Sequence, residues 1–400
     1  MKNTAAVSSK SGIASSSTSQ SVPMLDLKRQ YAPLHDELLA ALDQVLTSQQ
    51  FILGEAVSCF EKAAEAQLGV SHAVACSSGT DALWLALAAV GVGPGQAVIT
   101  TPFSFFASAS SILRAGAVPV LADIDPRTFN LNPGSVEEVL DSPSGAAVRA
   151  ILPVHLYGQC AEWDAFASLA KTFTLELVED AAQAWGAEWK GVKAGALGSA
   201  AAFSFYPTKN LSAAGDAGMV TSTKEDVAER LRMLRQHGMR RRYYHDEVGW
   251  NTRMDGFQGA VLSVKLKYIE KWNEDRRTAA NRYHQLFTAA GLAESGIYPE
   301  KGVVLPTEAK GRRHVWHQYV IRTQRRDELR AFLAERKIGS EIYYPVPLHL
   351  QEALRQLGYL EGDFPEAERA ARYVLALPIF AEIREDEQKT VVDAIAEFLS

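Results

Sequence analysis

The feature that most constrains this chain is a repeated alternation of apolar runs and helical stretches between residues 73 and 223. The apolar runs are short and nearly uninterrupted, which is typical of strands buried on both faces of a parallel sheet. Helices between such strands cover the two faces of the sheet, so the pattern predicts a doubly wound α/β domain. We expect its active site outside the carboxyl ends of the strands. The expected strands are 73–76, 97–100, 118–123, 148–154, 174–180, 199–205 and 218–222, and the expected helices between them are 81–90, 106–116, 133–140 and 161–172.

The composition changes beyond residue 291. Helical patterns at 224–236 and 256–290 are followed by an expected strand at 315–323, a helix at 325–337, a strand at 340–345 and a last helix at 384–400. We therefore expect a large α/β domain over 23–270 and a smaller α+β domain over 271–400, with the first helix of the chain able to pack on the small domain. Residues 1–22 are rich in Ser, Thr and Ala and predict a disordered tail. This tail lacks the apolar core of a secretory signal and the arginines of a transit peptide.

Charge and cysteine usage exclude several classes of protein. The net charge of −6 argues against general nucleic-acid binding. The cysteines, Cys59, Cys76 and Cys160, are far apart and form no CxxC motif, which argues against a disulfide scaffold or a metal site and favours a reducing cytoplasm. We find no apolar run long enough to span a membrane.

The segment CSSGTDAL, residues 76–83, is the first candidate for a binding site. It follows an expected strand and begins an expected helix, and its small residues present backbone N–H groups at the positive end of that helix. This arrangement suits a phosphate group. The alternative is that Ser78 or Thr80 only caps the helix.

Two further segments carry groups with possible chemistry. Asp180 ends an apolar strand in LVEDAAQAWGA, where a carboxylate needs a cationic partner such as a protonated pyridine nitrogen, unless it is a helix cap. Lys209 follows a strand in FSFYPTKNLSAAGDAG, and partial burial would make its amine a nucleophile, unless it is a solvated loop lysine. A phosphate loop, a strand-end aspartate and a loop lysine together meet the needs of pyridoxal 5′-phosphate.

These segments also carry a resemblance to a known family. The chain resembles the DegT/DnrJ/EryC1/StrS sugar aminotransferases of pyridoxal-phosphate fold type I, from about residue 23 to near the C-terminus. The resemblance implies a mixed, mostly parallel seven-stranded sheet flanked by helices, with a smaller C-terminal α+β domain. The motifs that carry it are SSGTDALWLAL, TPFSFFASASSILRAGAVPVLADID, PVHLYGQCAEWD, VEDAAQAWGA, SFYPTKNL, GDAGMV and GWNTRMDGFQGAVLSVKL.

The resemblance implies a role for each matching residue. Lys209 matches the lysine that holds the cofactor as a Schiff base, and Asp180 matches the carboxylate on the pyridine nitrogen. Gln183 matches the residue at the ring hydroxyl, and Asn251 matches an asparagine that reaches the phosphate from the other subunit of a homodimer. Gly79, Thr80 and Ser204 match phosphate-binding positions, and Phe106 matches the aromatic that stacks on the ring, with Phe103 and Phe105 close enough to leave the register open.

The family reaction moves an amino group from L-glutamate to a nucleotide-linked keto-sugar. Relatives that dehydrate sugars have His at the position of Lys209 or extra cysteines for an iron–sulfur cluster, so this sequence favours transamination. The motifs look most like the branch that aminates carbon 3 of UDP-2-acetamido-3-keto-uronic acids. The alternatives are a 3-aminotransferase for dTDP-3-keto-6-deoxyhexoses, a pyridoxal-phosphate-dependent dehydratase and a non-enzymatic regulator.

Four residues are candidates for substrate contacts. Arg241 lies in a run of arginines that could meet a pyrophosphate or a uronate, or could simply be a solvated basic loop. Arg253 is two residues after Asn251 and could reach the sugar or the donor carboxylate across the dimer interface that the resemblance implies. His317 and His349 match recurrent family positions, although a lone His is as often a structural residue. No metal ligands are expected.

Overall fold

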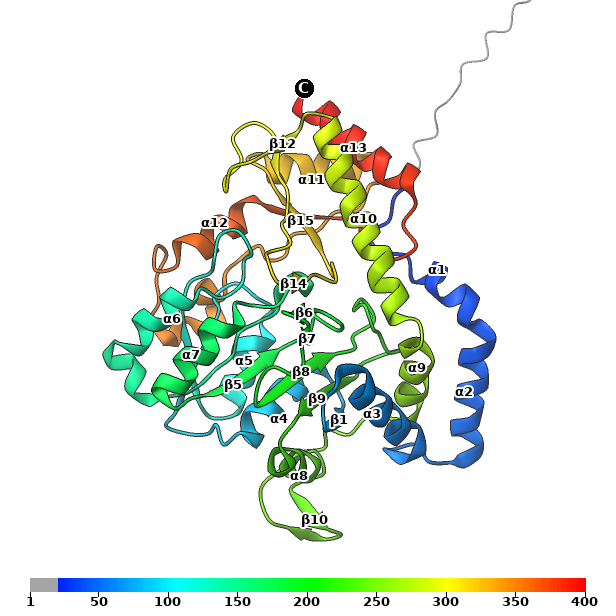
Figure 1. The fold of residues 1–400 in the computed structure, drawn as a ribbon, viewed down its shortest axis with the longest axis vertical. Helices are drawn as coiled ribbons and strands as arrows, with labels where there is room; N and C mark the ends of the chain where they lie inside the picture. Colours follow the sequence, from blue (N-terminus) through cyan, green and yellow to red (C-terminus); the bar gives the residue numbers. More distant parts are fainter. Residues whose placement is uncertain (1–20) are drawn as a thin grey trace, which may run out of the picture.

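A computed structural model describes residues 21–400, and its centre is a seven-stranded sheet in the order β1-β9-β8-β5-β4-β2-β3 (Figure 1). The five strands from β8 to β3 run parallel, whereas β9 is antiparallel to both of its neighbours, β1 and β8. The predicted mixed, mostly parallel sheet is therefore confirmed. Its strands are β1 (His72–Cys76), β2 (Ala97–Thr100), β3 (Val118–Leu121), β4 (Val148–Ile151), β5 (Glu176–Asp180), β8 (Ala200–Ser204) and β9 (Gly218–Ser222).

Helices cover both faces of this sheet, and α4 (Gly79–Ala89) shows why its sequence is apolar all round. It packs on strands β8 and β9 and on helices α5 and α8, so almost every side chain between Ala82 and Ala89 is buried. Ser78 caps its first turn by accepting a hydrogen bond from the backbone of Asp81. The other helices of this part of the chain are α1 (Leu27–Tyr31), α2 (His35–Ser48), α3 (Gly54–Leu68), α5 (Ala107–Arg114), α6 (Pro133–Leu140), α7 (Trp163–Phe173), α8 (Glu225–Leu234) and α9 (Gly256–Leu266).

A second layer of structure follows α9. Helix α10 (Ile269–Ala289) lies against α13 (Glu385–Leu399) at the top of Figure 1, and both cover a four-stranded sheet in the order β12-β13-β15-β16. The elements of this layer are β12 (Ala293–Glu294), β13 (Val303–Val304), β15 (Tyr319–Arg322), α11 (Arg326–Glu335), α12 (Pro365–Tyr373) and β16 (Val374–Leu377). Two small sheets complete the fold. One has three strands in the order β14 (Arg312–Arg313), β6 (Glu188–Trp189) and β7 (Val192–Lys193), and the other is a hairpin of β10 (Met239–Arg241) and β11 (Tyr244–His245).

The N-terminal segment packs on this C-terminal layer. Val22 is fully buried in its core and pairs with Ile338, and Arg29 forms an ion pair with Glu387 of α13 at 2.6 Å. The sequence predicts a disordered tail over residues 1–22. Residues 1–20 of it lie outside the described part of the chain, but Val22 is ordered core, so the predicted boundary lies at least one residue too late.

Two predicted elements differ from the observed ones. The segment 340–345 was expected to be a strand, but it makes only an isolated bridge between Glu341 and Ala376 before it turns toward the large sheet. The long segment 256–290 was expected as one helical stretch, and it is instead two helices that break at Lys267 and Tyr268. The proposed division of the domains near residue 270 falls at this break.

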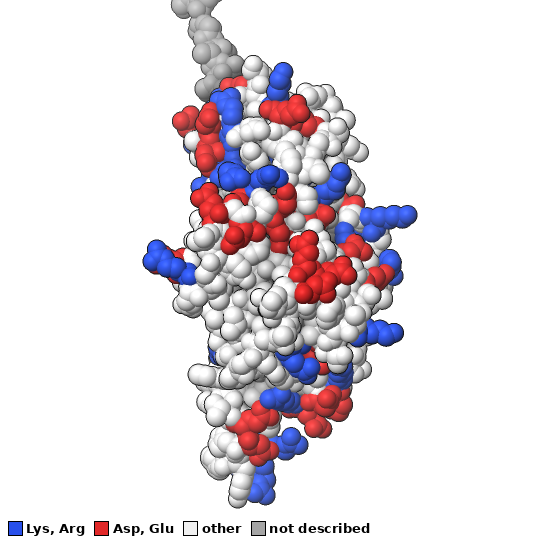
Figure 2. Space-filling model, turned by 90° about the vertical axis from the view of Figure 1, so that its left-hand side faces the viewer, with Lys and Arg blue, Asp and Glu red and all other residues white. Residues whose placement is uncertain are grey.

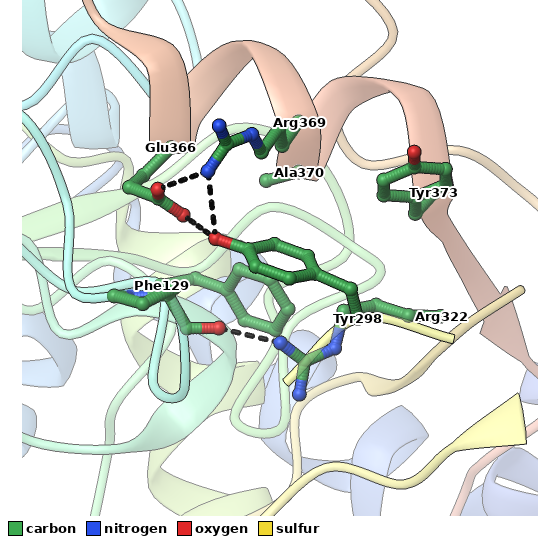
Figure 3. Close-up of a pocket in the computed structure, with 8 residues that line it drawn as sticks. Phe129, Tyr298, Arg322, Glu366, Arg369, Ala370 and Tyr373 are labelled. Carbon is green, nitrogen blue, oxygen red and sulfur yellow. Dashed lines mark hydrogen bonds and ion pairs between the residues drawn. The ribbon is translucent and has the colours of Figure 1, made fainter. Parts of the chain in front are cut away.

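Figure 3 shows a small crevice where the two layers meet. The guanidinium of Arg322 lies over the Phe129 ring, 5.1 Å from its centroid, so β15 is tied to the loop after β3. Tyr298 donates a hydrogen bond to Glu366, which also pairs with Arg369 at 2.7 Å. The polar groups of this crevice are engaged with one another, and we assign it a structural role.

The charged side chains do not form a single large patch on the face in Figure 2, where acidic and basic groups are mixed among uncharged ones. Within residues 21–400, no helix is both long and apolar enough to cross a membrane. All three cysteines are free thiols, with Cys59 exposed and the other two buried.

Candidate functional site

Asp180 and Lys209 meet at the carboxyl edge of the large sheet. Strand β5 ends at Asp180 and pairs in parallel with β8, so both strands end at the same edge. A turn closed by a hydrogen bond from Lys209 N to Tyr206 O at 2.8 Å follows β8 and presents the lysine there. Burial lowers the pKa of Lys209 to about 8, and the Asp180 carboxylate raises it in part. The lysine that the sequence singled out therefore has a usable neutral amine.

The Asp180 carboxylate is buried and held by two hydrogen bonds. Ser108 Oγ on α5 donates to Oδ2 at 2.7 Å, and the backbone N–H of Ala182 donates to Oδ1 at 3.2 Å. Burial raises the pKa of Asp180, while these two bonds and the charge of Lys209 oppose that rise. A buried carboxylate of this kind is best suited to a cationic partner.

The predicted phosphate loop lies beside these two residues. Gly79 begins α4 and is packed so closely on Ser204, the last residue of β8, that a Cβ at Gly79 would lie 2.5 Å from the Ser204 Cβ. Gly218 likewise leaves room for the carbonyl oxygen of Ser78, which would lie 2.2 Å from a Cβ there. Thr80 is exposed in the first turn of α4. Together they form a narrow cradle of backbone and hydroxyl groups at a helix N-terminus, which suits a phosphate.

Gln183 is fixed between two tyrosines. The backbone N–H of Tyr157 donates to Gln183 Oε1 at 2.6 Å, and Gln183 Nε2 donates to the Tyr344 hydroxyl at 3.1 Å. Tyr344 comes from the segment 340–345 of the C-terminal layer. This segment does not continue as a strand because it turns to bring Tyr344 to Gln183. Phe105 is 59% exposed and its ring lies 6.5 Å from that of Tyr344, whereas Phe103 is fully buried.

Phe106, the predicted stacking residue, is 36% exposed and stands at the start of α5. Phe103 and Phe105 both lie near Tyr344, with ring centroids 6.1 Å and 6.5 Å from that of Tyr344, which hydrogen-bonds Gln183. Asn251 is exposed, and its side-chain oxygen accepts a hydrogen bond from Arg253 Nε at 3.0 Å. The intervening Thr252 accepts a backbone bond from Ser77 at 3.1 Å, which places this segment next to the phosphate loop.

The two histidines differ in their placement. His317 is buried beside Lys209, and its Nδ1 lies 3.2 Å from the Asn210 side-chain oxygen. Burial and then the charge of Lys209 hold the pKa of His317 well below its usual range, so the ring is neutral. His349 is buried elsewhere, with its Nε2 3.1 Å from Glu368 of α12. The structure thus brings His317 to the site and gives His349 a structural partner.

Arg241 lies far from this edge of the sheet within its own chain. It belongs to the β10–β11 hairpin, which projects past α8 at the lower end of Figure 1. Its guanidinium stacks on Tyr244, 3.7 Å from the ring centroid, and Arg242 lies over Tyr243 in the same way at 5.0 Å.

Several site residues escaped sequence analysis. Ser108, Tyr157 and Tyr344 reach the site only through tertiary contacts, whereas Asn210 directly follows Lys209 in the motif SFYPTKNL. Ser108 and Tyr157 do lie inside quoted motifs, so those motifs could have drawn attention to them, but nothing in the local sequence of Tyr344 signals its contact. Within residues 21–400 no group of three or more His, Cys, Asp or Glu side chains could hold a metal ion.

The residues fit the cofactor that the sequence implies. An amine with a pKa of about 8 stands beside a buried carboxylate, and a cradle that a single Cβ would fill lies at the start of α4. Lys209 would carry the carbonyl end of pyridoxal 5′-phosphate, Asp180 its ring nitrogen and the Gly79–Ser204 cradle its phosphate.

Comparison with known proteins gives consistent matches over nearly the whole chain. Residues 33–396 match the model of the DegT/DnrJ/EryC1/StrS aminotransferase family. A pleiotropic regulatory protein of Geobacillus stearothermophilus is 48% identical, over 94% of this chain and 98% of its own. The dTDP-3-amino-3,4,6-trideoxy-alpha-D-glucose transaminase of Streptomyces venezuelae is 42% identical, over 94% of this chain and 96% of its own.

A third relative and a solved structure extend this picture. The UDP-2-acetamido-2-deoxy-3-oxo-D-glucuronate aminotransferase of Pseudomonas aeruginosa is 34% identical, over 90% of this chain and 95% of its own. The crystal structure of DesV from S. venezuelae, in complex with a ketimine intermediate, superposes with a TM-score of 0.89 at 42% identity, and the match covers 95% of this chain and 99% of that one.

Proposed function

The chain belongs to the DegT/DnrJ/EryC1/StrS aminotransferase family, and from this we propose that it moves an amino group from L-glutamate to carbon 3 of a nucleotide-linked 3-keto sugar. The enzyme is a pyridoxal-phosphate-dependent transaminase, as its family is. The observation that carries the proposal is the pairing of Lys209, whose pKa is lowered to about 8, with the buried Asp180 at the carboxyl edge of the sheet.

When bound, pyridoxal 5′-phosphate supplies an electron-accepting ring that stabilises the negative charge left when a proton departs from a substrate carbon. Lys209 provides the amine that anchors the cofactor and then accepts and returns that proton at Nζ. Asp180 keeps a positive charge on the ring nitrogen through its buried carboxylate. Gln183, held by Tyr157 and Tyr344, orients the edge of the ring that carries the hydroxyl.

Two nucleotide sugars compete as the acceptor. The dTDP-linked 3-keto-deoxyhexose class is supported by a relative at 42% identity, and the UDP-linked 3-keto-uronate class by one at 34%. The sequence motifs alone favoured the second class, and the similarity over the whole chain favours the first. We therefore propose the dTDP-linked class as acceptor and keep the UDP-uronate class as the second candidate.

We further propose a homodimer in which Asn251 and the β10–β11 hairpin contribute to the partner's site. Several large side chains of this region are exposed, among them Tyr243 at 76%, Val248 at 85% and Trp250 at 48%. Exposed apolar groups on a projecting hairpin, and in the loop that follows it, favour docking on another surface. A cytoplasmic location also remains a proposal, supported by three free thiols.

The direct test is the absorbance of the purified protein after reconstitution with pyridoxal 5′-phosphate. We expect a yellow form that excess L-glutamate converts to the colourless amine form of the cofactor, because the amino group remains on the cofactor when the keto acid leaves. Each candidate keto-sugar is then added to the amine form, and the true acceptor restores the yellow form fastest.

Each outcome has a distinct meaning. A colour that glutamate leaves unchanged would overturn glutamate as the donor and favour the dehydratase alternative. Failure to form the yellow state would overturn the assignment of Lys209. Conversion by glutamate without reoxidation by either 3-keto sugar would contradict the proposed acceptor, and cofactor binding with no turnover would favour the regulatory alternative.

A further inference from the structure

The Asp180 carboxylate is reached by a short chain of serine hydroxyls. Ser108 Oγ donates to Asp180 Oδ2 at 2.7 Å, and Ser104 Oγ lies 2.9 Å from Ser108 Oγ. Both serines are almost fully buried, at 1% and 4% exposure. Ser104 lies in the loop after β2, and Ser108 is the second residue of α5, so one local segment supplies both hydroxyls.

The number of hydrogens on each group fixes which atom donates in each of these hydrogen bonds. A serine hydroxyl has one hydrogen and two lone pairs, and an ionised carboxylate can only accept. Ser108 therefore gives its single hydrogen to Asp180, and Ser104 gives its own to Ser108. The side chain of Ser108 is then fixed by one bond that it makes and one that it receives.

We propose that Ser108 is a positioning residue that holds the Asp180 carboxylate ionised and aimed at the cofactor's ring nitrogen, with Ser104 fixing the Ser108 hydroxyl. This inference rests on the proposed placement of Asp180 at that nitrogen. One carboxylate oxygen is occupied by Ser108, and the other takes the backbone N–H of Ala182. The carboxylate plane is thus set before any ligand arrives.

Asp180 needs the Ser108 hydrogen bond to stay ionised because its carboxylate is buried. Burial alone favours the protonated acid, and a hydrogen bond donated to the charged form opposes this. The Ser108 bond is the largest such opposing effect on the pKa of Asp180, ahead of the Ala182 N–H and of the charge of Lys209. Without Ser108 the carboxyl group gains proton affinity and freedom to rotate, and a charged contact to the ring nitrogen becomes a weaker neutral one.

The test compares two cofactors on one protein. The second is 1-deazapyridoxal 5′-phosphate, in which a C–H replaces the ring nitrogen, so it cannot pair with Asp180. Equilibrium binding to the full-length apoprotein, followed by cofactor absorbance, gives the preference for the natural cofactor. Ser108→Ala is expected to reduce that preference roughly 10-fold, the loss of one hydrogen bond to a charged group. The affinity for the deaza analogue should change little.

Three further variants separate positioning from packing. Ser108→Thr keeps the hydroxyl and is expected to keep the preference. Ser104→Ala removes only the supporting bond and is expected to reduce the preference roughly 3-fold. Ser111→Ala is the matched control, because Ser111 is fully buried on the same helix and its hydroxyl faces the Ser108 carbonyl at 3.5 Å instead of Asp180.

The outcomes distinguish this inference from the proposed function. A wild-type protein that binds both cofactors equally would overturn the placement of Asp180, and the role of Ser108 with it. A wild-type preference that survives Ser108→Ala would overturn the role of Ser108 alone, as would an equal loss in Ser111→Ala. If Ser108→Ala does not fold, the contrast between Ser104→Ala and Ser108→Thr decides, and no difference between them overturns the inference.

Discussion

His155 and Glu179 form a fully buried pair next to the end of β5, with His155 Nε2 3.0 Å from a Glu179 oxygen. Three backbone N–H groups between residues 195 and 198 donate to the same carboxylate at 2.7 to 2.9 Å. The backbone N–H of Ala161 donates to His155 Nδ1 at 3.1 Å, so the other ring nitrogen carries the hydrogen. Because Glu179 precedes Asp180 on β5, this pair fixes the strand end that presents the Asp180 carboxylate.

Glu179→Gln should destabilise the fold although it is nearly isosteric. The new amide group places N–H donors against N–H donors, and we expect a loss of about 2 to 3 kcal/mol in the free energy of unfolding. Urea denaturation measures this loss as a lower midpoint concentration, with an unchanged dependence of the unfolding free energy on urea concentration. The exposed Glu138→Gln is the control and should leave the midpoint in place. A Glu179→Gln protein as stable as the wild type would contradict the buried network.

The amine of Lys209 should titrate with a midpoint of about 8 in the apoprotein. Burial disfavours its charged form, so the neutral, reactive fraction is small below this pH and rises as the pH passes through it. Trace labelling with acetic anhydride over a series of pH values, read by peptide mass spectrometry, measures the midpoint. Lys171 on the surface of α7 provides the reference peptide.

Asp180→Asn should move this midpoint further down. The Asp180 carboxylate raises the pKa of Lys209, so its neutral replacement removes that support while the burial remains. A midpoint that stays in place, or moves up, would show that the Asp180 carboxylate does not raise the pKa of Lys209.

Gly79→Ala should weaken cofactor binding. The added Cβ would lie 2.5 Å from Ser204 Cβ, so it must displace Ser204 or close the cradle in which we place the phosphate. We expect the dissociation constant of pyridoxal 5′-phosphate to rise by about 10- to 100-fold, the loss of one or two hydrogen bonds to a charged group. Gly93→Ala is the control, since a Cβ there meets nothing within 4 Å. Equal binding by both variants would place the phosphate elsewhere.

Mixing two inactive variants should restore activity if the sites are shared. Lys209→Ala and Asn251→Ala subunits, unfolded and refolded together, form heterodimers in which one site has both residues intact. Random pairing then gives about a quarter of wild-type activity. The pair Lys209→Ala and Asp180→Ala is the control, because both residues lie in the same chain's site and leave no intact one. Absence of rescue in the first mixture would mean that Asn251 serves its own subunit.

The sequence predicted the large domain best where the signal was local. Strands β2 and β9 and helix α6 have the predicted bounds, because continuous apolar runs and the Pro at the start of α6 mark them. The segment 340–345 was mistaken for a strand because its aromatic residues favour a sheet, whereas its contact with Gln183 requires an irregular path.

The candidate site residues were also predicted best where the signal was local. Asp180 ends β5 and Lys209 lies in the turn after β8, so their positions in the sequence marked both as candidates, and the family resemblance implied a role for each. Ser108 lies 72 positions from Asp180 in the chain, and Tyr344 lies 161 from Gln183, so their contacts exist only in the folded protein. His349 matched a family position as a possible substrate contact, which stays a prediction, and its Nε2 lies 3.1 Å from Glu368, a partner that the sequence did not signal.

The burial of Val22 among helices α10 and α13 has a consequence for synthesis on the ribosome. Val22 is made well before Ile395, which belongs to the same core. The large sheet ends at Ser222, so all of its strands have emerged before the C-terminal core can close. Val22 therefore stays uncovered on the nascent protein until the residues of α13 have been made.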